Sequence, residues 1–412
     1  MKKIIRIILL FIVIALVFTI TNYRNINRNN SEEVKVDQNN DNSNTITYDG
    51  LVVTIDDVIL YDISKKEVGK LGKNVELEVT SVDNTYLKTT IVDNEYYLKT
   101  DNIESIEETL EYDIRYKNYI IYNENVVSNE SKLYDRENNL VYSLNTAINS
   151  PIIIKEDNRY GIEFNNRLLY VNKEDVEVVS NDNTNLDNIK KIPVLNYHFF
   201  YDETSQEEIQ DCNQSICHSK KQFISHLDYI KNNNIFTPTM EELEMYIDGQ
   251  IQLPKSIVIT IDDGWRMNIG VDLLEEYKLN ATVFLISGWY ENTDFLKNYN
   301  YVEFHSHGEK LHNQGVCPGG QGGAIKCLEK TKLLEDLAKS RSKLNNTTVF
   351  CYPFYEYNNY SIQVLKEAGF TMAFKGYDQY DNYVRVGSKK LELPRFVIYN
   401  STSVENLKSY LN

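Results

Sequence analysis

Residues 257–265 read IVITIDDGW, and this stretch decides the fold of the C-terminal half of the chain. Its first five residues form a run that is typical of a strand buried in a parallel sheet. The carboxylates Asp262 and Asp263 follow directly, and Gly264 permits a turn after them. Active sites of α/β sheets and barrels lie at the carboxyl ends of the strands, so we expect this pair to belong to one.

Three further segments place polar side chains after a short apolar run. Residues 192–195 precede Tyr197 and His198, residues 301–304 precede His305, His307 and His312, and Val349-Phe350 precedes Cys351. Four of the six histidines lie here, which favours one converged site over four chance occurrences. Helical patterns alternate with these strands at 219–233, from the capping box Thr239–Glu242, and at 271–279, 328–344 and 361–368. The pattern predicts an α/β domain with a mainly parallel sheet or barrel.

The residue types in these segments suit metal-dependent hydrolysis. One of the two adjacent carboxylates can bind a metal while the other stays free as a base. His307 and His312 are five residues apart, which on a straight helix separates them by about 140°, so they need a loop to share a metal. Two His and one Asp leave an open coordination position, as in a catalytic site. Water activated there would attack an amide carbonyl, and His198 would protonate the departing amine.

Each part also has an ordinary interpretation. An Asp-Asp-Gly sequence alone is commonly a turn, and a single His is more often a solvated side chain than a ligand. His305 would face away from its neighbour His307, and His218 and His226 have no motif around them. The prediction of a site therefore rests on the whole set.

Four segments together resemble one known family. They are TIDDGW at 260–265, Ser306-His307 with His312, YPFYEYN at 352–358 and PVLNYH at 193–198. They resemble the motifs of the polysaccharide deacetylase family (NodB homology, carbohydrate esterase family 4), over roughly residues 190–412. The resemblance implies a distorted (β/α)7 barrel. The five-residue His spacing and the Tyr-His opening are most similar to the poly-N-acetylglucosamine deacetylase branch.

The resemblance also implies a role for each site residue. Asp262 would be the general base, and His198 would be the general acid. The metal ligands would be Asp263, His307 and His312. The metal would be Zn²⁺, although Co²⁺, Ni²⁺ or Mn²⁺ would fit the same ligands.

The chain departs from the family pattern in the third motif and beyond it. Cys351 stands where many members have Arg, Tyr355 stands where they have Gly, and no His follows His312. Tyr355 would narrow the substrate cleft. Arg395, in a Leu-Pro-Arg segment that resembles an element of the same branch, would orient Asp262, because a carboxylate base benefits from a charged partner. The ordinary alternative for Arg395 is a surface salt bridge.

The N-terminal half predicts a different kind of structure. Residues 48–179 form short alternating runs, which are typical of an all-β region, and the pattern recurs at an offset of 73, as in Tyr61-Asp62 and Tyr134-Asp135. Two small barrels at 48–110 and 111–180 would account for the repeat, and their closing pattern weakly resembles bacterial SH3-like domains. Such domains would contact the cell wall. The alternative is a spacer that packs on the catalytic domain.

The N-terminus predicts a membrane anchor. A basic flank precedes an apolar run that ends at Ile20, without a cleavage signal after it, so we expect residues 1–21 to be an uncleaved signal anchor rather than a cleaved signal peptide. Polar linkers are expected at 22–47 and 181–191, and the catalytic domain at 192–412. The protein would then be a single-pass protein of the cell membrane with an extracytoplasmic catalytic domain.

Charge and cysteine content narrow the partners. The 43 Lys and Arg against 60 Asp and Glu give a formal net charge of −17, which argues against nucleic-acid binding. Outside the cytoplasm, Cys212 with Cys217 and Cys317 with Cys327 could each close a short loop by a disulfide, while Cys351 is expected to be a buried thiol. A structural zinc on Cys212, Cys217 and His218 is the alternative, although it lacks a fourth ligand.

We therefore expect an enzyme that hydrolyses N-acetyl groups of N-acetylglucosamine residues in a polysaccharide. The repeats and the short tether favour peptidoglycan, whereas the motif subtype favours a secreted poly-N-acetylglucosamine, and we lean to peptidoglycan. An idle glycan-binding or scaffold protein is the alternative, which Cys351, Tyr355 and the missing late His support. A peptidase with the same metal chemistry would need a signature such as H-E-x-x-H, which the chain lacks.

Overall fold

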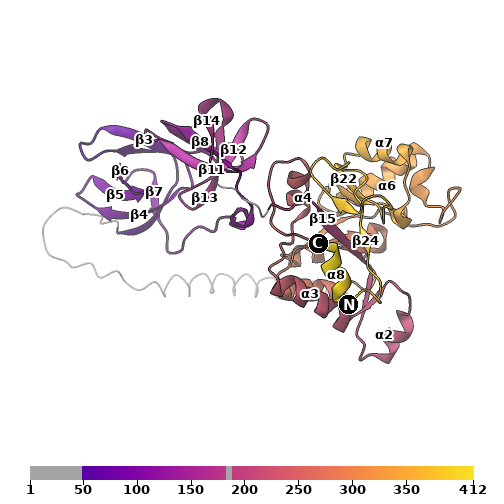
Figure 1. Ribbon diagram of the computed structural model, residues 1–412. Coiled ribbons are helices and arrows are strands. Elements are labelled where there is room, and N and C mark those ends of the chain that lie inside the picture. The colour runs from indigo at the N-terminus through magenta and orange to yellow at the C-terminus, as the bar shows by residue number, and fades with distance from the viewer. Residues whose placement is uncertain (1–48, 182–187) are drawn as a thin grey trace, which may run out of the picture. The chain divides into compact units, whose positions relative to one another are not determined.

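The computed structural model describes residues 49–181 and 188–412 (Figure 1). The expected signal anchor at 1–21 and linker at 22–47 lie outside these residues, as does most of the linker at 181–191. In the described ranges, no helix has the length and apolar character needed to span a membrane. The described chain has an all-β region that ends at Ser180 and an α/β region that begins at Ile192.

The all-β region contains two sets of seven strands. The first set is β1 (Gly50–Thr54), β2 (Val58–Tyr61), β3 (Glu67–Leu71), β4 (Glu76–Ser81), β5 (Tyr86–Ile91), β6 (Asn94–Lys99) and β7 (Ile103–Ser105). The second set is β8 (Glu124–Ser128), β9 (Ser131–Tyr134), β10 (Leu140–Leu144), β11 (Ile148–Lys155), β12 (Arg159–Phe164), β13 (Arg167–Asn172) and β14 (Glu177–Ser180). Short 3-10 helices cover η1 (Arg115–Asn118) and η2 (Lys173–Asp175).

The two sets share one antiparallel pairing scheme. The strand order in the first set is β7, β1, β4, β5, β6, β2 and β3. The order in the second set is β14, β8, β11, β12, β13, β9 and β10, which is the same scheme. Tyr61 pairs with Tyr97, and Tyr134 pairs with Tyr170 at the equivalent place. Pairing of β3 with β10 joins the sets. The seven-strand unit is thus duplicated at the offset seen in the sequence.

Alternation of apolar and polar side chains gives these strands one buried face. In β4, Leu77 and Val79 are buried, while Glu78 and Thr80, which alternate with them, are exposed. Successive side chains of a strand point to opposite faces, so this pattern fixes which face meets the core. One continuous apolar core includes residues of both sets, among them Leu60, Leu98, Leu133 and Leu169.

The α/β region alternates strands with helices, as its sequence predicts. Its strands are β15 (Ile192–Tyr197), β16 (Phe199–Tyr201), β17 (Cys217–Ser219), β18 (Val258–Asp263), β19 (Ala281–Leu285), β20 (Val302–Ser306), β21 (Val349–Cys351), β22 (Met372–Phe374), β23 (Tyr383–Val384) and β24 (Phe396–Val397). Its α-helices are α2 (Gln206–Asp211), α3 (Lys220–Asn232), α4 (Met240–Ile247), α5 (Asn268–Tyr277), α6 (Lys330–Lys343), α7 (Asn359–Glu367) and α8 (Val404–Tyr410). The 3-10 helices are η3 (Ser287–Trp289), η4 (Asp294–Asn298), η5 (Ala324–Lys326) and η6 (Pro353–Tyr355).

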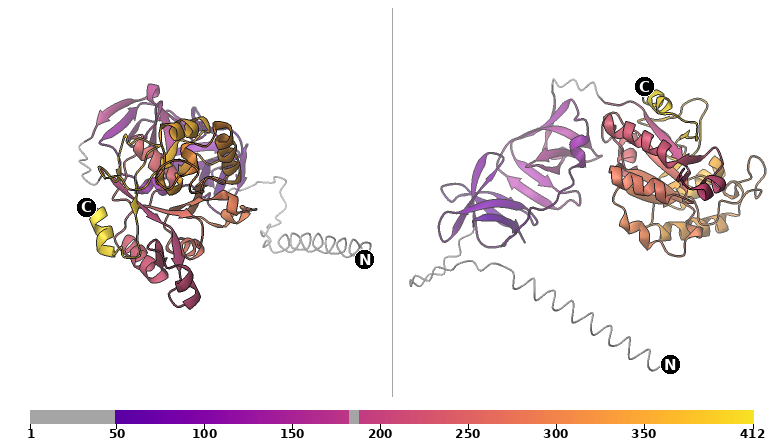
Figure 2. Two further views of the ribbon diagram at one scale, coloured as in Figure 1. Left: turned by 90° about the vertical axis from the view of Figure 1, so that its right-hand side faces the viewer. Right: turned by 90° about the horizontal axis from the view of Figure 1, so that it is seen from below.

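Seven parallel strands form the centre of this region, in the order β24, β15, β18, β19, β20, β21 and β22. An isolated parallel bridge between Phe374 and Leu393 connects β22 to the segment just before β24, so the sheet curls back on itself. Helices cover its outside (Figure 2). All six residues of β18 are buried, which explains the unbroken run at 257–261 that the sequence shows.

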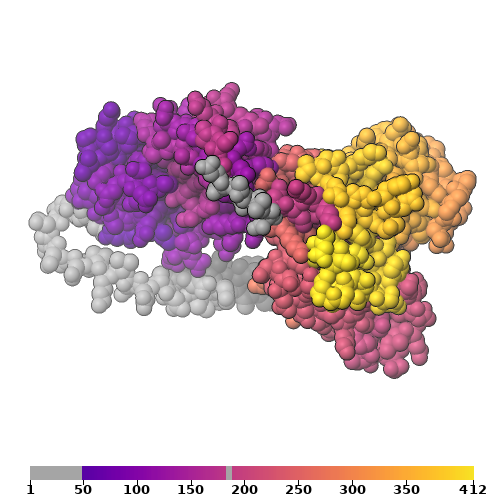
Figure 3. Space-filling view, in the orientation of Figure 1, coloured from indigo at the N-terminus to yellow at the C-terminus, as the bar shows by residue number. Residues whose placement is uncertain are grey.

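Side-chain caps begin the helices where the sequence predicts them. Ser219 accepts a hydrogen bond from the Gln222 amide at the start of α3, and Thr239 forms a reciprocal capping box with Glu242 at the start of α4. The C-terminal helix α8, yellow in Figure 3, lies on the surface. It packs beside α3, and the Lys408 ammonium group lies over the Tyr229 ring.

Two disulfides join the cysteine pairs that the sequence places close enough to close short loops. Cys212 is bonded to Cys217, and Cys317 is bonded to Cys327. The alternative of a structural zinc on Cys212 and Cys217 is therefore wrong, because a disulfide sulfur is no thiolate ligand. Cys351 is a buried free thiol in β21, as predicted.

Candidate active site

The backbone turns at Asp263, and this turn lets two adjacent carboxylates occupy different places. Asp263 has φ 70° and Gly264 has φ 90°, and the Gly264 amide donates to the Asp262 carbonyl at 2.8 Å. In a regular strand the two side chains would point to opposite faces of the sheet. The left-handed conformation, uncommon for a residue other than Gly, redirects the second carboxylate at the end of β18. The turn begins one residue earlier than the sequence analysis places it.

Asp262 is paired with Arg395 inside the protein. Nη1 of Arg395 donates to Oδ1 of Asp262 and Nη2 donates to Oδ2, each at 2.7 Å. Asp262 is 1% exposed and Arg395 is 0% exposed, which excludes the surface salt bridge considered for Arg395. Burial acts to raise the pKa of Asp262, but the guanidinium outweighs burial and holds that pKa below its ordinary range. The carboxylate is therefore ionised at neutral pH.

His307 and His312 meet at Asp263. Oδ1 of Asp263 lies 3.2 Å from Nε2 of His307 and 3.3 Å from Nε2 of His312. The candidate ligand atoms of the three residues all lie within 4.8 Å of one another. Nδ1 of His307 donates to the Cys351 carbonyl at 2.8 Å, so in the neutral, metal-binding form of the ring the lone pair is on Nε2, the atom beside Asp263. Two imidazole nitrogens and a carboxylate oxygen in this arrangement fit a divalent cation of the zinc type.

A loop between His307 and His312 brings the two side chains together, as their five-residue spacing requires. The chain leaves β20 at Ser306, and Gly308 reverses its direction with φ 86°. A Cβ atom at Gly308 would lie 2.9 Å from Cβ of Leu311, so only Gly fits this turn without displacement. The His312 ring then packs near the Phe354 ring, with 4.2 Å between centroids.

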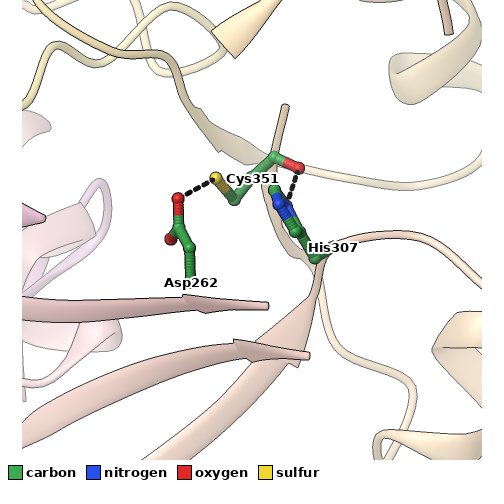
Figure 4. Close-up of side chains that lie close together, drawn as sticks. All are labelled: Asp262, His307 and Cys351. Carbon is green, nitrogen blue, oxygen red and sulfur yellow. Dashed lines mark hydrogen bonds between the residues drawn. The ribbon is translucent and has the colours of Figure 1, made fainter. Parts of the chain in front are cut away.

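Cys351 lies between the two halves of the site (Figure 4). Its thiol points toward Asp262, with 3.5 Å from Sγ to Oδ2, and its carbonyl points toward the His307 ring. Nη2 of Arg395 donates to the same sulfur at 3.0 Å. The position that holds Arg in many family members thus holds a small thiol here, and the guanidinium group reaches the carboxylate from Arg395 instead.

His198 follows β15 and is held by two neighbours that the sequence analysis did not place there. Nε2 of His198 lies 3.2 Å from the Tyr355 hydroxyl, and that hydroxyl donates to Oδ1 of Asn196 at 2.7 Å. His198 is 8% exposed, and burial lowers its pKa. Neither Asn196 nor Tyr355 carries a signal in a single sequence that would reveal these contacts, because they join segments about 160 residues apart.

The remaining histidines lie elsewhere. His305 faces away from the cluster, as expected, and its Nδ1 lies 2.6 Å from the Thr347 hydroxyl. His218 and His226 are both 0% exposed. Both are therefore core residues, in β17 and α3, and not solvated side chains. The sequence could not distinguish these two cases, because neither residue has a motif around it.

A groove of about 790 Å³ is lined by residues that follow Asp263 in the sequence, and none of the three candidate ligands is part of its lining. Its lining begins with Gly264 and Trp265, which directly follow Asp263, and it includes Trp289 and Tyr290. Trp265 is 40% exposed and Trp289 is 55% exposed, and these are the two Trp residues of the chain. The Trp289 ring lies 6.4 Å from the His312 ring between centroids. The groove therefore offers exposed aromatic faces, and one of them, that of Trp289, lies near a candidate metal ligand.

Comparison with known proteins identifies the class. The family model described as polysaccharide deacetylase matches residues 250–373, which include Asp262, Asp263, His307 and His312. No curated protein gives a significant match to the chain. The chain therefore contains a polysaccharide deacetylase domain, which is the domain of an enzyme. His198 and Arg395 lie outside the matched residues.

Solved structures of deacetylases show similarity to the chain. A de-N-acetylase from Aggregatibacter actinomycetemcomitans is 21% identical over 53% of this chain and 99% of its own, with a TM-score of 0.45. The deacetylase PplD of Streptococcus pyogenes, in complex with acetate, is 19% identical over 55% and 99%, with a TM-score of 0.44. IcaB from Ammonifex degensii is 20% identical over 54% and 98%, with a TM-score of 0.45. Similarity at this level does not define what this chain acts on.

Proposed function

We propose that the protein hydrolyses N-acetyl groups from N-acetylglucosamine residues of a cell-wall or cell-surface polysaccharide, in a metal-dependent reaction. The observation that carries the proposal is the meeting of His307 and His312 at one oxygen of Asp263, beside an ionised and unliganded Asp262. This arrangement provides a metal site and a separate base, which amide hydrolysis requires.

Asp263, His307 and His312 would hold the cation, and Zn²⁺ suits two imidazoles and one carboxylate. Co²⁺, Ni²⁺ and Mn²⁺ accept the same ligands. When bound, the cation supplies Lewis-acid activation of water and of the amide carbonyl.

The protein's own residues would divide the proton transfers between them. Asp262, kept ionised by Arg395, would accept the proton of the attacking water. Arg395 would orient this base through its two hydrogen bonds. His198 would give a proton to the nitrogen of the departing amine, so that the C–N bond can break. The products are acetate and a free amine on the sugar.

The groove lined by Trp265 and Trp289 would hold the polymer. Exposed aromatic rings combine a large apolar face with low conformational entropy cost, which suits a flat sugar ring. Trp265 and Trp289 would therefore bind sugars next to the reacting residue. We favour peptidoglycan over poly-N-acetylglucosamine as the polymer, with the two β repeats acting as SH3-like contacts to the wall.

The proposed location is the outer face of the cell membrane, with residues 1–21 as a single-pass anchor. The two disulfides of the α/β region support an extracytoplasmic catalytic domain, because disulfides persist in oxidising compartments. The anchor itself rests on the sequence alone.

Acetate release from purified peptidoglycan and from poly-N-acetylglucosamine tests the proposal. We expect release that requires added Zn²⁺, stops with chelator and is lost in Asp262→Asn. The better substrate identifies the polymer. Folded, metal-loaded protein that releases acetate from neither polymer would contradict the proposal and favour a glycan-binding role.

A further inference from the structure

Tyr355 has a backbone conformation that disfavours its own side chain. Phe354 and Tyr355 in η6 have φ 58° and φ 61°, in the left-handed region that glycine adopts without cost. A bulky aromatic residue there is an outlier, and such outliers cluster at functional sites because surrounding contacts must hold them in place. The contacts of Tyr355 therefore indicate what its side chain does.

The ring of Tyr355 is held on two sides. Gly376 lies against it, so that a Cβ atom at this glycine would come within 2.7 Å of the Tyr355 Cγ. The Arg395 guanidinium lies 5.6 Å from the ring centroid. Because Arg395 also holds Asp262, the ring is fixed relative to the base of the site. The hydroxyl at the far end of the ring is placed accordingly.

The direction of the hydrogen bonds at that hydroxyl is determined by Asn196. Nδ2 of Asn196 donates to the Tyr197 carbonyl at 3.2 Å, so its Oδ1 is the atom that faces Tyr355. An amide oxygen only accepts, and the single proton of Tyr355 is therefore donated to Asn196. The Tyr355 oxygen can then only accept from His198, which requires a proton on Nε2 of that ring.

The other ring nitrogen of His198 has no such restraint. Nδ1 is buried and has no hydrogen-bond partner among the described residues. The hydrogen bond from Nε2 to Tyr355 is therefore the contact that sets both the orientation of this imidazole and the position of its proton. Burial lowers the pKa of the ring, so the resting ring is neutral with its proton on Nε2. The proton given to the amine is therefore one that Nδ1 takes up during the reaction, while Nε2 stays on Tyr355.

We propose that Tyr355 is a positioning residue, whose hydroxyl aligns His198 for protonation of the departing amine. This inference rests on the proposed function. It gives a purpose to a side chain that stands where the family pattern has glycine, and it extends the acid half of the site from one residue to three: Asn196, Tyr355 and His198.

The test compares two leaving groups with the full-length, metal-loaded enzyme. An N-acetylglucosamine polymer releases an amine, which must be protonated, whereas 4-nitrophenyl acetate releases a phenolate that departs without a proton. We expect Tyr355→Phe to lower kcat on the glycan by ~10- to 100-fold, within the range of general-acid catalysis, with KM changed less than about twofold. We expect its rate on 4-nitrophenyl acetate to stay within about twofold of wild type.

Two controls separate positioning from a general structural effect. Tyr357→Phe removes a neighbouring hydroxyl that contacts Glu392 and not His198, and it should behave as wild type on both substrates. In a His198→Gln background, adding Tyr355→Phe should cause no further loss on the glycan, because the two residues act through one proton transfer.

Equal loss on both substrates, no loss on the glycan, or additive losses in the double variant would overturn the role of Tyr355. Failure of the proposed function looks different. In that case wild-type enzyme itself releases no acetate from any glycan, whatever residue occupies position 355.

Discussion

At the scale of single residues, Arg395 gives Asp262 the guanidinium partner for which many family members use an Arg of the third motif, at the position of Cys351. Cys351 cannot donate two parallel hydrogen bonds to a carboxylate, but its small side chain leaves room for a guanidinium from Arg395 to do so. The replacement of the family's Arg by Cys351 therefore does not deprive Asp262 of a positively charged partner. This weakens the main support for an idle scaffold protein.

Loss of Arg395 should leave a buried, unpaired carboxylate. We expect Arg395→Met to reduce the free energy of unfolding by about 3–5 kcal/mol, because the Asp262 charge loses its partner inside the protein. Adding Asp262→Asn should restore at least about half of that loss, since the charge is then absent. Urea unfolding of the two single variants and the double variant measures this. Strictly additive losses would show that the pair is not coupled.

Removal of one ligand should release the metal. We expect His312→Ala to weaken Zn²⁺ binding by ~100-fold or more, because a three-ligand site loses a ligand outright. His305→Ala is the matched control, since His305 contacts Thr347 and not the cluster. Titration calorimetry with Zn²⁺ measures the dissociation constant of both variants. Similar weakening in the two variants, or none in His312→Ala, would contradict the ligand assignment.

At the scale of elements, helix α3 is attached to the sheet through a neutral histidine. The Tyr197 hydroxyl of β15 lies 2.9 Å from Nδ1 of His226, and Nε2 of the same ring lies 3.1 Å from the Thr402 carbonyl. A carbonyl only accepts, so Nε2 carries the proton and Nδ1 accepts from Tyr197. The neutral ring satisfies both contacts, and protonation would break the first.

This attachment should make stability depend on acidity. Burial lowers the pKa of His226 to about 4, below its ordinary value of 6.5. Between these values the unfolded chain binds a proton that the folded protein excludes, so stability is full above about pH 6.5 and falls as pH decreases toward 4. We expect a loss of at most about 3 kcal/mol from this residue. Urea unfolding between pH 7 and 4.5 should show a shallower decrease in His226→Gln, and an equal slope would contradict this account.

The 3-10 helix η3 carries Trp289 to the groove. We expect Trp289→Ala to raise KM for the polymer about tenfold, which corresponds to about 1.4 kcal/mol of binding free energy, with little change in kcat. Tyr380→Ala is the control, because Tyr380 is 88% exposed and lies outside the groove lining. Steady-state kinetics on the glycan measure both. An unchanged KM in Trp289→Ala would exclude this face from polymer binding.

At the scale of the whole molecule, the sequence predicts elements and clusters better than it predicts partners. The run at 257–261 and the caps at Ser219 and Thr239 are local signals, and the structure has the expected strand and helices there. The internal repeat is visible because Tyr61 and Tyr134 recur at a fixed offset. The joining of the repeats through β3 and β10 is not, since strand pairing between distant segments leaves no local trace.

The same distinction applies to the site. Asp263, His307 and His312 were predicted to share a metal, and the structure brings them together through a loop that the spacing required. The contacts of Tyr355 with Asn196 and His198 could not be predicted, because they depend on a left-handed backbone that single-sequence patterns associate with glycine. The sequence also gives no sign that His226 is neutral, because burial and not sequence context decides the protonation state of this ring.

The long sequence separation of Arg395 from Asp262 has a consequence for biosynthesis. Its carboxylate partner Asp262 is made 133 residues earlier, so at about 5–20 residues per second the nascent chain carries it unpaired for roughly 7–27 s. An ionised carboxylate without a partner resists burial in an apolar interior. We therefore expect burial of β18 to follow the synthesis of Arg395, so that the site closes only after most of the α/β region has been made.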